Sequence, residues 1–138
     1  MALDPVTETI YLCDAPSNRV LKFPVGGNVT VLAGVLNTPG FTPDGALARG
    51  ARISGPTGIA IDGDGNVFFS ESGNRRVRWI DTNGILRTVA GTGQAGLISE
   101  GAIPTQCNFV RGNPPIFLDS KGNMYLTDLF NIVRFRPF

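Results

Sequence analysis

Residues 55–91 read GPTGIAIDGDGNVFFSESGNRRVRWIDTNGILRTVAG, and the rest of the chain repeats their pattern. The four short apolar runs of this stretch cover residues 58–62, 66–71, 76–81 and 86–91. Runs of strand length that are bounded by turn-forming residues predict a four-stranded antiparallel meander. Glycine and asparagine in the gaps Gly63–Gly65 and Thr82–Gly84 support this prediction, because both residues adopt the positive φ angles of tight hairpins easily.

The third run alternates in polarity. Val77 and Trp79 are apolar, and the neighbouring Arg76 and Arg78 are basic. Successive side chains of a strand point to opposite faces of a sheet. The alternation therefore predicts one buried face and one face whose guanidinium groups lie in solvent.

The same pattern occurs three times. Tyr11, Phe68 and Tyr125 occupy the same place in three apolar runs and are spaced 57 positions apart. The third run is repeated as residues 18–20, 74–77 and 131–133, and the fourth as residues 31–34 and 89–91. A fixed period with about four strands per unit is typical of a β-propeller or a similar repeat array. We expect one propeller segment whose repeat units cover about residues 1–54, 55–110 and 111–138.

These motifs resemble NHL repeats in their long-period variant. The resemblance is carried by Pro56-x-Gly58-Ile59-Ala60-x-Asp62, Gly65-Asn66-Val67-Phe68, Asn74-Arg75-x-Val77-Arg78, Thr88-Val89-Ala90-Gly91 and the linker Gly40-Phe41-x-x-Asp44-Gly45-x-x-Ala48. It implies an all-β fold of four-stranded antiparallel blades, within a six-bladed β-propeller. The third unit departs from the pattern, since Pro114-Pro115 stands where the second unit has Thr57-Gly58.

The chain supplies about half of such a ring. Met1–Asp4 aligns with Ile59–Asp62, and the sequence ends after a third strand, which gives two units of four strands and one of three. A half-ring leaves strand edges and apolar blade faces exposed to water. We favour the interpretation that the chain is a fragment of a longer propeller. The alternative is that copies associate through open blade edges into a ring or a fibre.

Two long linkers, residues 35–55 and 92–113, connect the units. Connections of this length predict surface loops, with a helical turn around Ala46–Arg52 in the first. In an up-and-down blade the linkers share one end with the turns between the second and third strands. A rigid scaffold with its long loops on one side is typical of a binding surface.

The candidate binding residues end the second strands or follow them in the loops. They are Asp14, Asn18, Arg19, Glu71, Asn74, Arg75, Asp128 and Asn131. One interpretation is local, with acids and asparagines bonding backbone amides in their turns and arginines pairing with acids. The other is that some of them form a ring that contacts a protein, a peptide or a glycan.

Charge and hydropathy disfavour two classes of partner. The net charge of +1 provides no overall field for nucleic acid or an anionic membrane, and only Arg75, Arg76 and Arg78 form a basic group. No apolar run approaches the ~20 residues of a membrane span. A protein or peptide partner is therefore favoured.

Catalysis and cofactors are also disfavoured. A chain without histidine has no Ser/His/Asp triad, no Cys/His pair and no histidine metal site. Asp62-Gly63-Asp64-Gly65-Asn66 resembles the start of a calcium loop, but the twelfth position is Gly73 instead of glutamate, so a hairpin turn is favoured. We predict a non-catalytic scaffold without metal or cofactor. The alternative is a fragment of a propeller enzyme of the lyase or lactonase type, whose catalytic residues lie outside this segment; Asp62 and Asp119 are its only channel-adjacent acids.

Three residues bear on the compartment. Cys13 and Cys107 lie one blade apart, too far for a disulfide, so we expect free thiols. Asn28-Val29-Thr30 is a glycosylation sequon, which is usable only in a secreted protein. The sequon favours an extracellular location slightly, and the compartment is otherwise undetermined.

Overall fold

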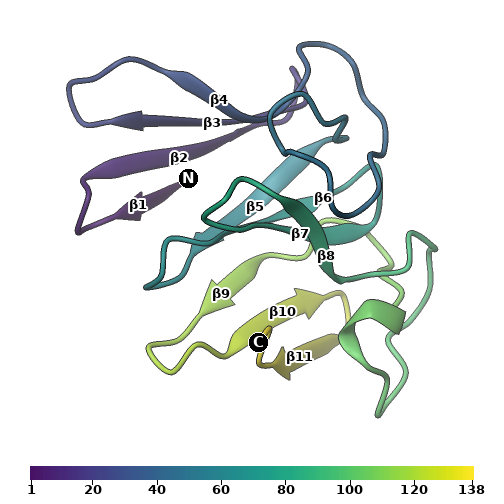
Figure 1. The fold of residues 1–138 in the computed structure, drawn as a ribbon. Coiled ribbons are helices and arrows are strands. Elements are labelled where there is room, and N and C mark those ends of the chain that lie inside the picture. The colour runs from purple at the N-terminus through teal and green to yellow at the C-terminus, as the bar shows by residue number, and fades with distance from the viewer.

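The computed structural model describes residues 1–138 and contains three antiparallel sheets (Figure 1). The first sheet comprises β1 (Ala2–Asp4), β2 (Thr9–Asp14), β3 (Arg19–Pro24) and β4 (Thr30–Gly34). The second sheet comprises β5 (Pro56–Ile61), β6 (Val67–Glu71), β7 (Arg76–Ile80) and β8 (Leu86–Ala90). The third sheet comprises β9 (Ile116–Leu118), β10 (Met124–Asp128) and β11 (Asn131–Phe135), and is preceded by the 3-10 turn η1 (Pro104–Gln106).

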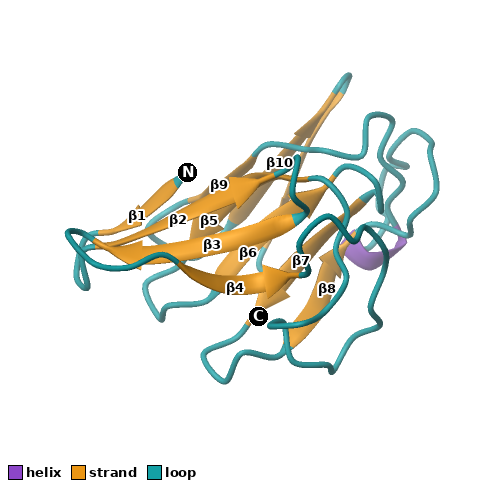
Figure 2. Cartoon of the chain, turned by 90° about the horizontal axis from the view of Figure 1, so that it is seen from above, coloured by secondary structure: helices purple, strands orange, loops and turns teal.

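Each sheet is a meander in which sequential strands pair, and the sheets stack face to face (Figure 2). The predicted all-β architecture of propeller blades is confirmed. Within the second sheet, β5 begins two residues before the predicted run, and the other strand ends lie within one residue of the predicted ends.

Two apolar cores join the sheets. The first core lies between the first and second sheets and includes Val20, Ala33 and Phe69. The second core lies between the second and third sheets and includes Phe68 and Leu126. Phe68 and Phe69 are adjacent in β6 and both fully buried, so the two faces of the second sheet are both covered.

This double coverage corrects one expectation. Arg78 was expected in solvent, but its side chain is completely buried, because the first linker covers the face of β7 that carries it. Val77 is buried on the opposite face and Trp79 is half-buried there. The alternation in β7 therefore separates two buried faces from each other.

The first linker also differs from expectation. Residues 46–52 form no helical turn, and they make bridges with strands instead: Gly34 pairs with Arg49, and Leu47 pairs with Ile85. Ala48, Ala51 and Ile53 are buried in the first core. The linker is therefore a packed part of the fold as well as a surface loop. The only 3-10 turn is η1, in the second linker, where Pro104 occupies its first residue and supplies a helical φ angle.

The third sheet has a shorter turn between its second and third strands. Asp128 pairs with Asn131 across a two-residue turn, whereas Glu71 pairs with Arg76 across four residues. Asn131 is thus the first residue of β11 and does not lie in a loop. Because of the shorter turn, Val133 in β11 takes the place that Arg78 has in β7, which corrects the equivalence expected from the sequence.

The turns divide between two sides of the stack (Figure 1). The turns between first and second strands, and between third and fourth strands, lie on one side, which we call the tight-turn side. The two linkers and the turns β2–β3, β6–β7 and β10–β11 lie on the other, which we call the long-loop side. The arrangement expected from strand direction is observed.

A glycine at the end of each outer strand, Gly34 in β4 and Gly91 directly after β8, allows a tight approach of two backbone segments. Gly91 has a φ angle of +95°, and a Cβ atom there would lie 2.4 Å from the Arg75 carbonyl oxygen. Gly34 has the same role, with a φ angle of +94° and 2.1 Å to the Asn18 carbonyl oxygen. Only glycine satisfies both the positive φ angle and the close approach.

We predict that Gly91→Ala lowers the free energy of unfolding more than Gly84→Ala. Gly84 has a φ angle of +79° but open space around its Cα. Its substitution should cost only the ~1–2 kcal/mol of the left-handed conformation. Gly91→Ala should add about 1–3 kcal/mol for the overlap with backbone. Urea unfolding followed by Trp79 fluorescence measures both, and equal losses would contradict the close approach.

Candidate binding face

The eight predicted residues all lie on the long-loop side. Asp14, Glu71 and Asp128 end β2, β6 and β10, and Arg19 and Asn131 begin β3 and β11. Asn18, Asn74 and Arg75 lie in the turns between these strands. The structure therefore distributes the candidates over the three sheets, and most of them make internal contacts.

The second sheet contains a buried ion pair. Arg78 Nη1 lies 3.2 Å from Glu71 Oε2, and both side chains have 0% exposure. Glu71 and Arg78 share a face because Arg78 pairs with Phe69, two residues before Glu71 in β6. Arg78 is not among the predicted site residues, and its local sequence gives no signal for a buried charge.

The first linker supplies the other partners of this pair. Glu71 Oε1 accepts hydrogen bonds from the Ser54 amide and from Asn74 Nδ2, both at 2.9 Å. Arg78 Nη2 donates to the Thr42 carbonyl oxygen at 2.8 Å. Burial raises the pKa of the Glu71 carboxyl, and Arg78 opposes this shift. The pair thus fastens the linker to the sheet at two points, Thr42 and Ser54.

The same linker packs on arginine through an aromatic ring. The guanidinium carbons of Arg76 and Arg78 lie 4.3 and 4.9 Å from the centroid of the Phe41 ring. Asp44 accepts hydrogen bonds from the Thr88 amide at 3.0 Å and its hydroxyl at 2.9 Å. Phe41 and Asp44, which belong to the linker motif, therefore hold the linker against β7 and β8.

The first sheet has a more exposed counterpart. Asp14 pairs with Arg19 at 3.3 Å, and about a quarter of each side chain is accessible to solvent. A hydrogen bond from Ser17, assisted by Arg19, lowers the pKa of Asp14. Exposed pairs of this kind contribute little to stability, because water screens them.

Two turn residues reach across to the following linker. Asn18 and Arg75 have positive φ angles of 57° and 49° and precede β3 and β7. Asn18 Oδ1 accepts a hydrogen bond from the Gly55 amide at 2.9 Å. Arg75 Nη1 donates to the carbonyl oxygens of Phe109 at 3.0 Å and Val110 at 2.6 Å. Both side chains therefore connect one sheet to the chain segment that enters the next.

The third sheet leaves the most side chains exposed on this side. Asp128 uses its two oxygens to accept the amides of Val110 at 2.7 Å and Leu129 at 2.9 Å. Asn131, Leu129 and Phe130 are exposed, with Phe130 at 76%. Leu129 and Phe130 are not among the predicted site residues, although two apolar residues in a two-residue turn are the signal that could have revealed them. A binding role for the eight predicted residues stays a prediction.

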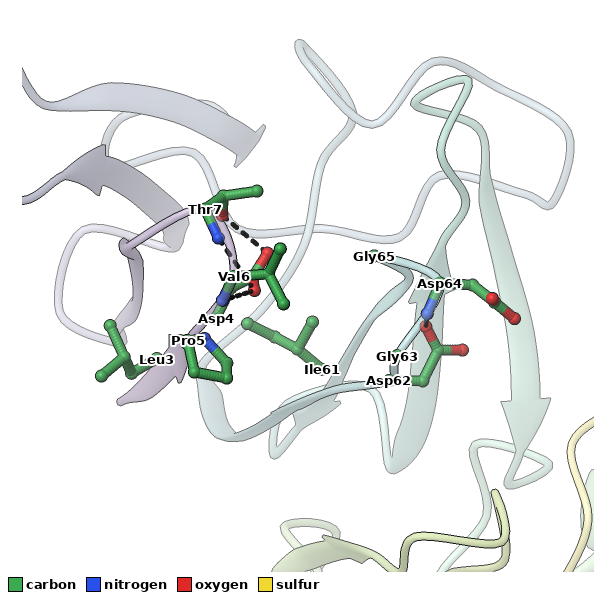
Figure 3. A pocket seen from close by; sticks show the side chains of 10 residues that line it. All are labelled: Leu3, Asp4, Pro5, Val6, Thr7, Ile61, Asp62, Gly63, Asp64 and Gly65. Atoms are coloured by element: carbon green, nitrogen blue, oxygen red, sulfur yellow. Dashed lines mark hydrogen bonds between the residues drawn. The ribbon is translucent and has the colours of Figure 1, made fainter.

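A pocket of about 430 Å³ lies on the tight-turn side, between the β1–β2 and β5–β6 turns (Figure 3). The carboxylates of Asp4 and Asp62 accept hydrogen bonds within their own turns. Asp4 Oδ1 accepts the Val6 amide at 2.9 Å, and Asp62 Oδ1 accepts the amides of Asp64 at 3.0 Å and Asn66 at 2.9 Å. No three Asp, Glu or Cys side chains anywhere in the structure are placed to hold a metal ion. Asp62 and its counterpart Asp119 therefore serve as turn residues.

Both cysteines are unpaired, as predicted. Cys107 is buried, and Cys13 is half-buried in the first core. Burial raises the pKa of the Cys13 thiol to about 12, so the reactive thiolate is scarce at neutral pH. Separately, no helix of the structure has the length and apolar character needed to cross a membrane.

The sequence matches a known family. The profile described as the Teneurin NHL domain matches residues 1–110. Teneurin-1 of Gallus gallus is 33% identical over 104 residues, which are 67% of this chain and 4% of that protein. The chain thus spans a small part of the teneurins that it matches.

Solved structures show the same fold. A protein of unknown function from Bacteroides thetaiotaomicron superposes with a TM-score of 0.76 and 25% identity, over 94% of this chain and 32% of that chain. A chain in a nidogen/laminin complex superposes with a TM-score of 0.62 and 21% identity, over 98% of this chain and 42% of that chain. These propeller likenesses agree with the NHL-type architecture described above.

We predict that Glu71→Met lowers the free energy of unfolding by about 3 kcal/mol or more, because it removes the buried partner of Arg78 and leaves only the half-exposed Asp44 at 3.4 Å. The double variant Glu71→Met, Arg78→Met should lose much less than the sum of the single losses. Urea unfolding of Glu71→Met, Arg78→Met and the double variant measures this coupling. Additive losses would show that the pair is energetically unimportant.

Proposed function

The chain belongs to the teneurin NHL domain family, and on this basis we propose that it is a non-catalytic scaffold that binds a protein or peptide through its long-loop side. The observation that carries the proposal is the collection of five loops, two of them long linkers, on one side of three stacked sheets. Catalytic function would need a reactive group, and the acids and thiols described above are occupied in turns or buried.

The rigidity of these loops supports a binding role. The buried Glu71–Arg78 pair and the Asn18 and Arg75 bridges hold the linkers in one arrangement. A surface that is ordered before binding loses less conformational entropy when a partner docks. The exposed Phe130 and Leu129 add apolar contact area, and aromatic residues are enriched at protein interfaces.

The relatives agree with this proposal at the level of fold. The chain covers 4% of Teneurin-1, so the activity of that whole protein is no guide to this segment by itself. The nidogen/laminin structure is a complex of proteins that contains a chain of this fold. Protein binding by such a propeller is what we extend to this chain.

We predict that a photo-crosslinking residue at Asn131, on the long-loop side, captures a defined protein from an extract of the source cells. The control is the same residue at Val25, which is 62% exposed in the β3–β4 turn on the tight-turn side. Mass spectrometry identifies the adducts. Adducts from Val25 alone, or from neither position, would count against a binding role for the long-loop side.

A second candidate function is self-association, which a repeated pattern of burial favours. Val67 and Phe69 in β6 are buried against the first sheet, and Phe68 is buried against the third. Their equivalents in β2, Ile10 and Leu12, lie on the open face of the first sheet, together with the exposed Leu3. The equivalent of Phe68 is Tyr125, on the open face of the third sheet.

That face is also apolar. Phe117 pairs with Tyr125 in the third sheet, and Ile132 lies on the same side. Phe117 and Ile132 are 64% and 73% exposed. The open face of the third sheet in one copy can therefore pack on the open face of the first sheet in another, as adjacent sheets pack within the chain.

We predict that residues 1–138 form a particle of at least twice the chain mass of 14.7 kDa, measured by light scattering. Ile132→Asp should convert this particle to a monomer, because a carboxylate in the apolar interface would lose its hydration. Thr105→Asp, an exposed change in η1, serves as the control. A monomeric unsubstituted chain would overturn self-association.

A further inference from the structure

The start of β9 differs from the start of β5. In the second sheet the Gly58 amide donates to Ser70 Oγ at 2.9 Å, and this bond helps to close β5 onto β6. Pro115 has the place of Gly58 in the third sheet, and proline has no amide hydrogen to donate. Accordingly β9 has three residues where β5 has six, and the Thr127 hydroxyl, in the place of Ser70 Oγ, makes no hydrogen bond within the protein.

This opening leaves a hollow of about 260 Å³ on the long-loop side, between the end of the second linker and the β10–β11 turn. Its lining includes Arg111, Asn113, Pro115, Thr127, Asp128 and Leu129. We call it the β9 niche. It lies next to the exposed Phe130 in the β10–β11 turn.

The wall that carries Arg111 is held firmly. The neighbouring Val110 is bonded through its amide to Asp128 and through its carbonyl oxygen to Arg75. Gly112 is buried, and a Cβ atom there would lie 2.7 Å from the Ser72 carbonyl oxygen. The backbone on both sides of Arg111 is therefore fixed, while its own side chain is exposed and makes no ion pair or hydrogen bond.

The free groups of the niche are mainly donors. The Arg111 guanidinium offers five N–H groups, and the Asn113 amide and the Thr127 hydroxyl offer further hydrogen bonds. The Asp128 carboxylate accepts two backbone amides and forms no ion pair with Arg111. An unpaired guanidinium on a fixed backbone segment can bind a carboxylate through two parallel hydrogen bonds.

We propose that the β9 niche binds an acidic peptide segment of a protein partner. Its carboxylate bonds Arg111, and an adjacent apolar side chain packs on Leu129 and Phe130. This inference rests on the proposed scaffold function and names the chemistry of the partner. The carboxylate can belong to an acidic side chain or to a peptide C-terminus, since both present the same two oxygens.

The test uses three peptides, titrated into ¹⁵N-labelled protein and followed by NMR. Acetyl-Leu-Glu-Leu-amide carries a side-chain carboxylate, acetyl-Leu-Gln-Leu carries a C-terminal carboxylate, and acetyl-Leu-Gln-Leu-amide carries neither. We expect at least one carboxylate peptide to shift the amide signals of residues 110–113 and 127–131. Its affinity should exceed that of the neutral peptide about tenfold, the effect of one hydrogen bond to a charged group.

The Arg111→Gln variant should remove this tenfold preference. Arg49→Gln is the matched control, because Arg49 is also exposed and its side chain makes no ion pair. The carboxylate peptide that binds more tightly identifies the source of the carboxylate. The proposal that the β9 niche binds an acidic peptide would be overturned by equal binding of charged and neutral peptides, or by equal effects of the two variants. Signal shifts confined to residues outside 110–113 and 127–131 would overturn it as well.

The failure of this inference is separable from failure of the scaffold function. If the photo-adducts formed from Asn131 persist unchanged in Arg111→Gln, peptide binding in the β9 niche is overturned. The proposal of protein binding through the long-loop side then remains intact. Loss of adducts in that variant, with adducts retained in Arg49→Gln, supports both.

Discussion

The long-loop side depends on a carboxylate and a guanidinium that are both removed from water. Glu71 and Arg78 are fully buried, and burying two charges is costly unless every remaining hydrogen-bonding group finds a partner. The first linker supplies most of those partners, through the Ser54 amide, the Thr42 carbonyl oxygen and the Asp44 carboxylate, and Arg78 Nε is left without one. The position of the linker is therefore a condition for the stability of the sheet beneath it, and this explains why so long a loop has a single packed arrangement.

The first and third sheets have no buried ion pair of this kind. Leu21 in β3 and Val133 in β11 have the place of Arg78, so neither of these sheets contains a buried cation at that point. Their acids are correspondingly freer: Asp14 forms a partly exposed pair, and Asp128 bonds backbone amides only. The buried pair occurs in the sheet that is covered on both faces, where water is absent and a partner must come from the protein.

The sequence predicts the strands well because apolar runs and turn residues are local signals, and the 57-residue spacing reports the length of one unit. It fails for Arg78, because alternation in β7 predicts one buried and one exposed face, whereas both faces of the second sheet are covered. It also fails for Ala46–Arg52, where small residues indicate packing in the first core and not a helical turn. The contacts of Asn18 and Arg75 join segments 34 or more residues apart, so no local pattern predicts them.

The contacts between linkers and sheets determine which side chains still have free hydrogen-bonding groups for a ligand. A side chain whose donors or acceptors already join a linker to a sheet, as in Glu71, cannot exchange those bonds for a ligand without loosening the fold. One free group lies where a unit departs from the repeat, at Pro115, whose missing amide leaves the Thr127 hydroxyl without the bond that Ser70 Oγ accepts from Gly58. Residues such as Glu71 and Arg78 hold a linker to a sheet, and the binding that we propose uses a position at which the repeat is broken, as at Pro115.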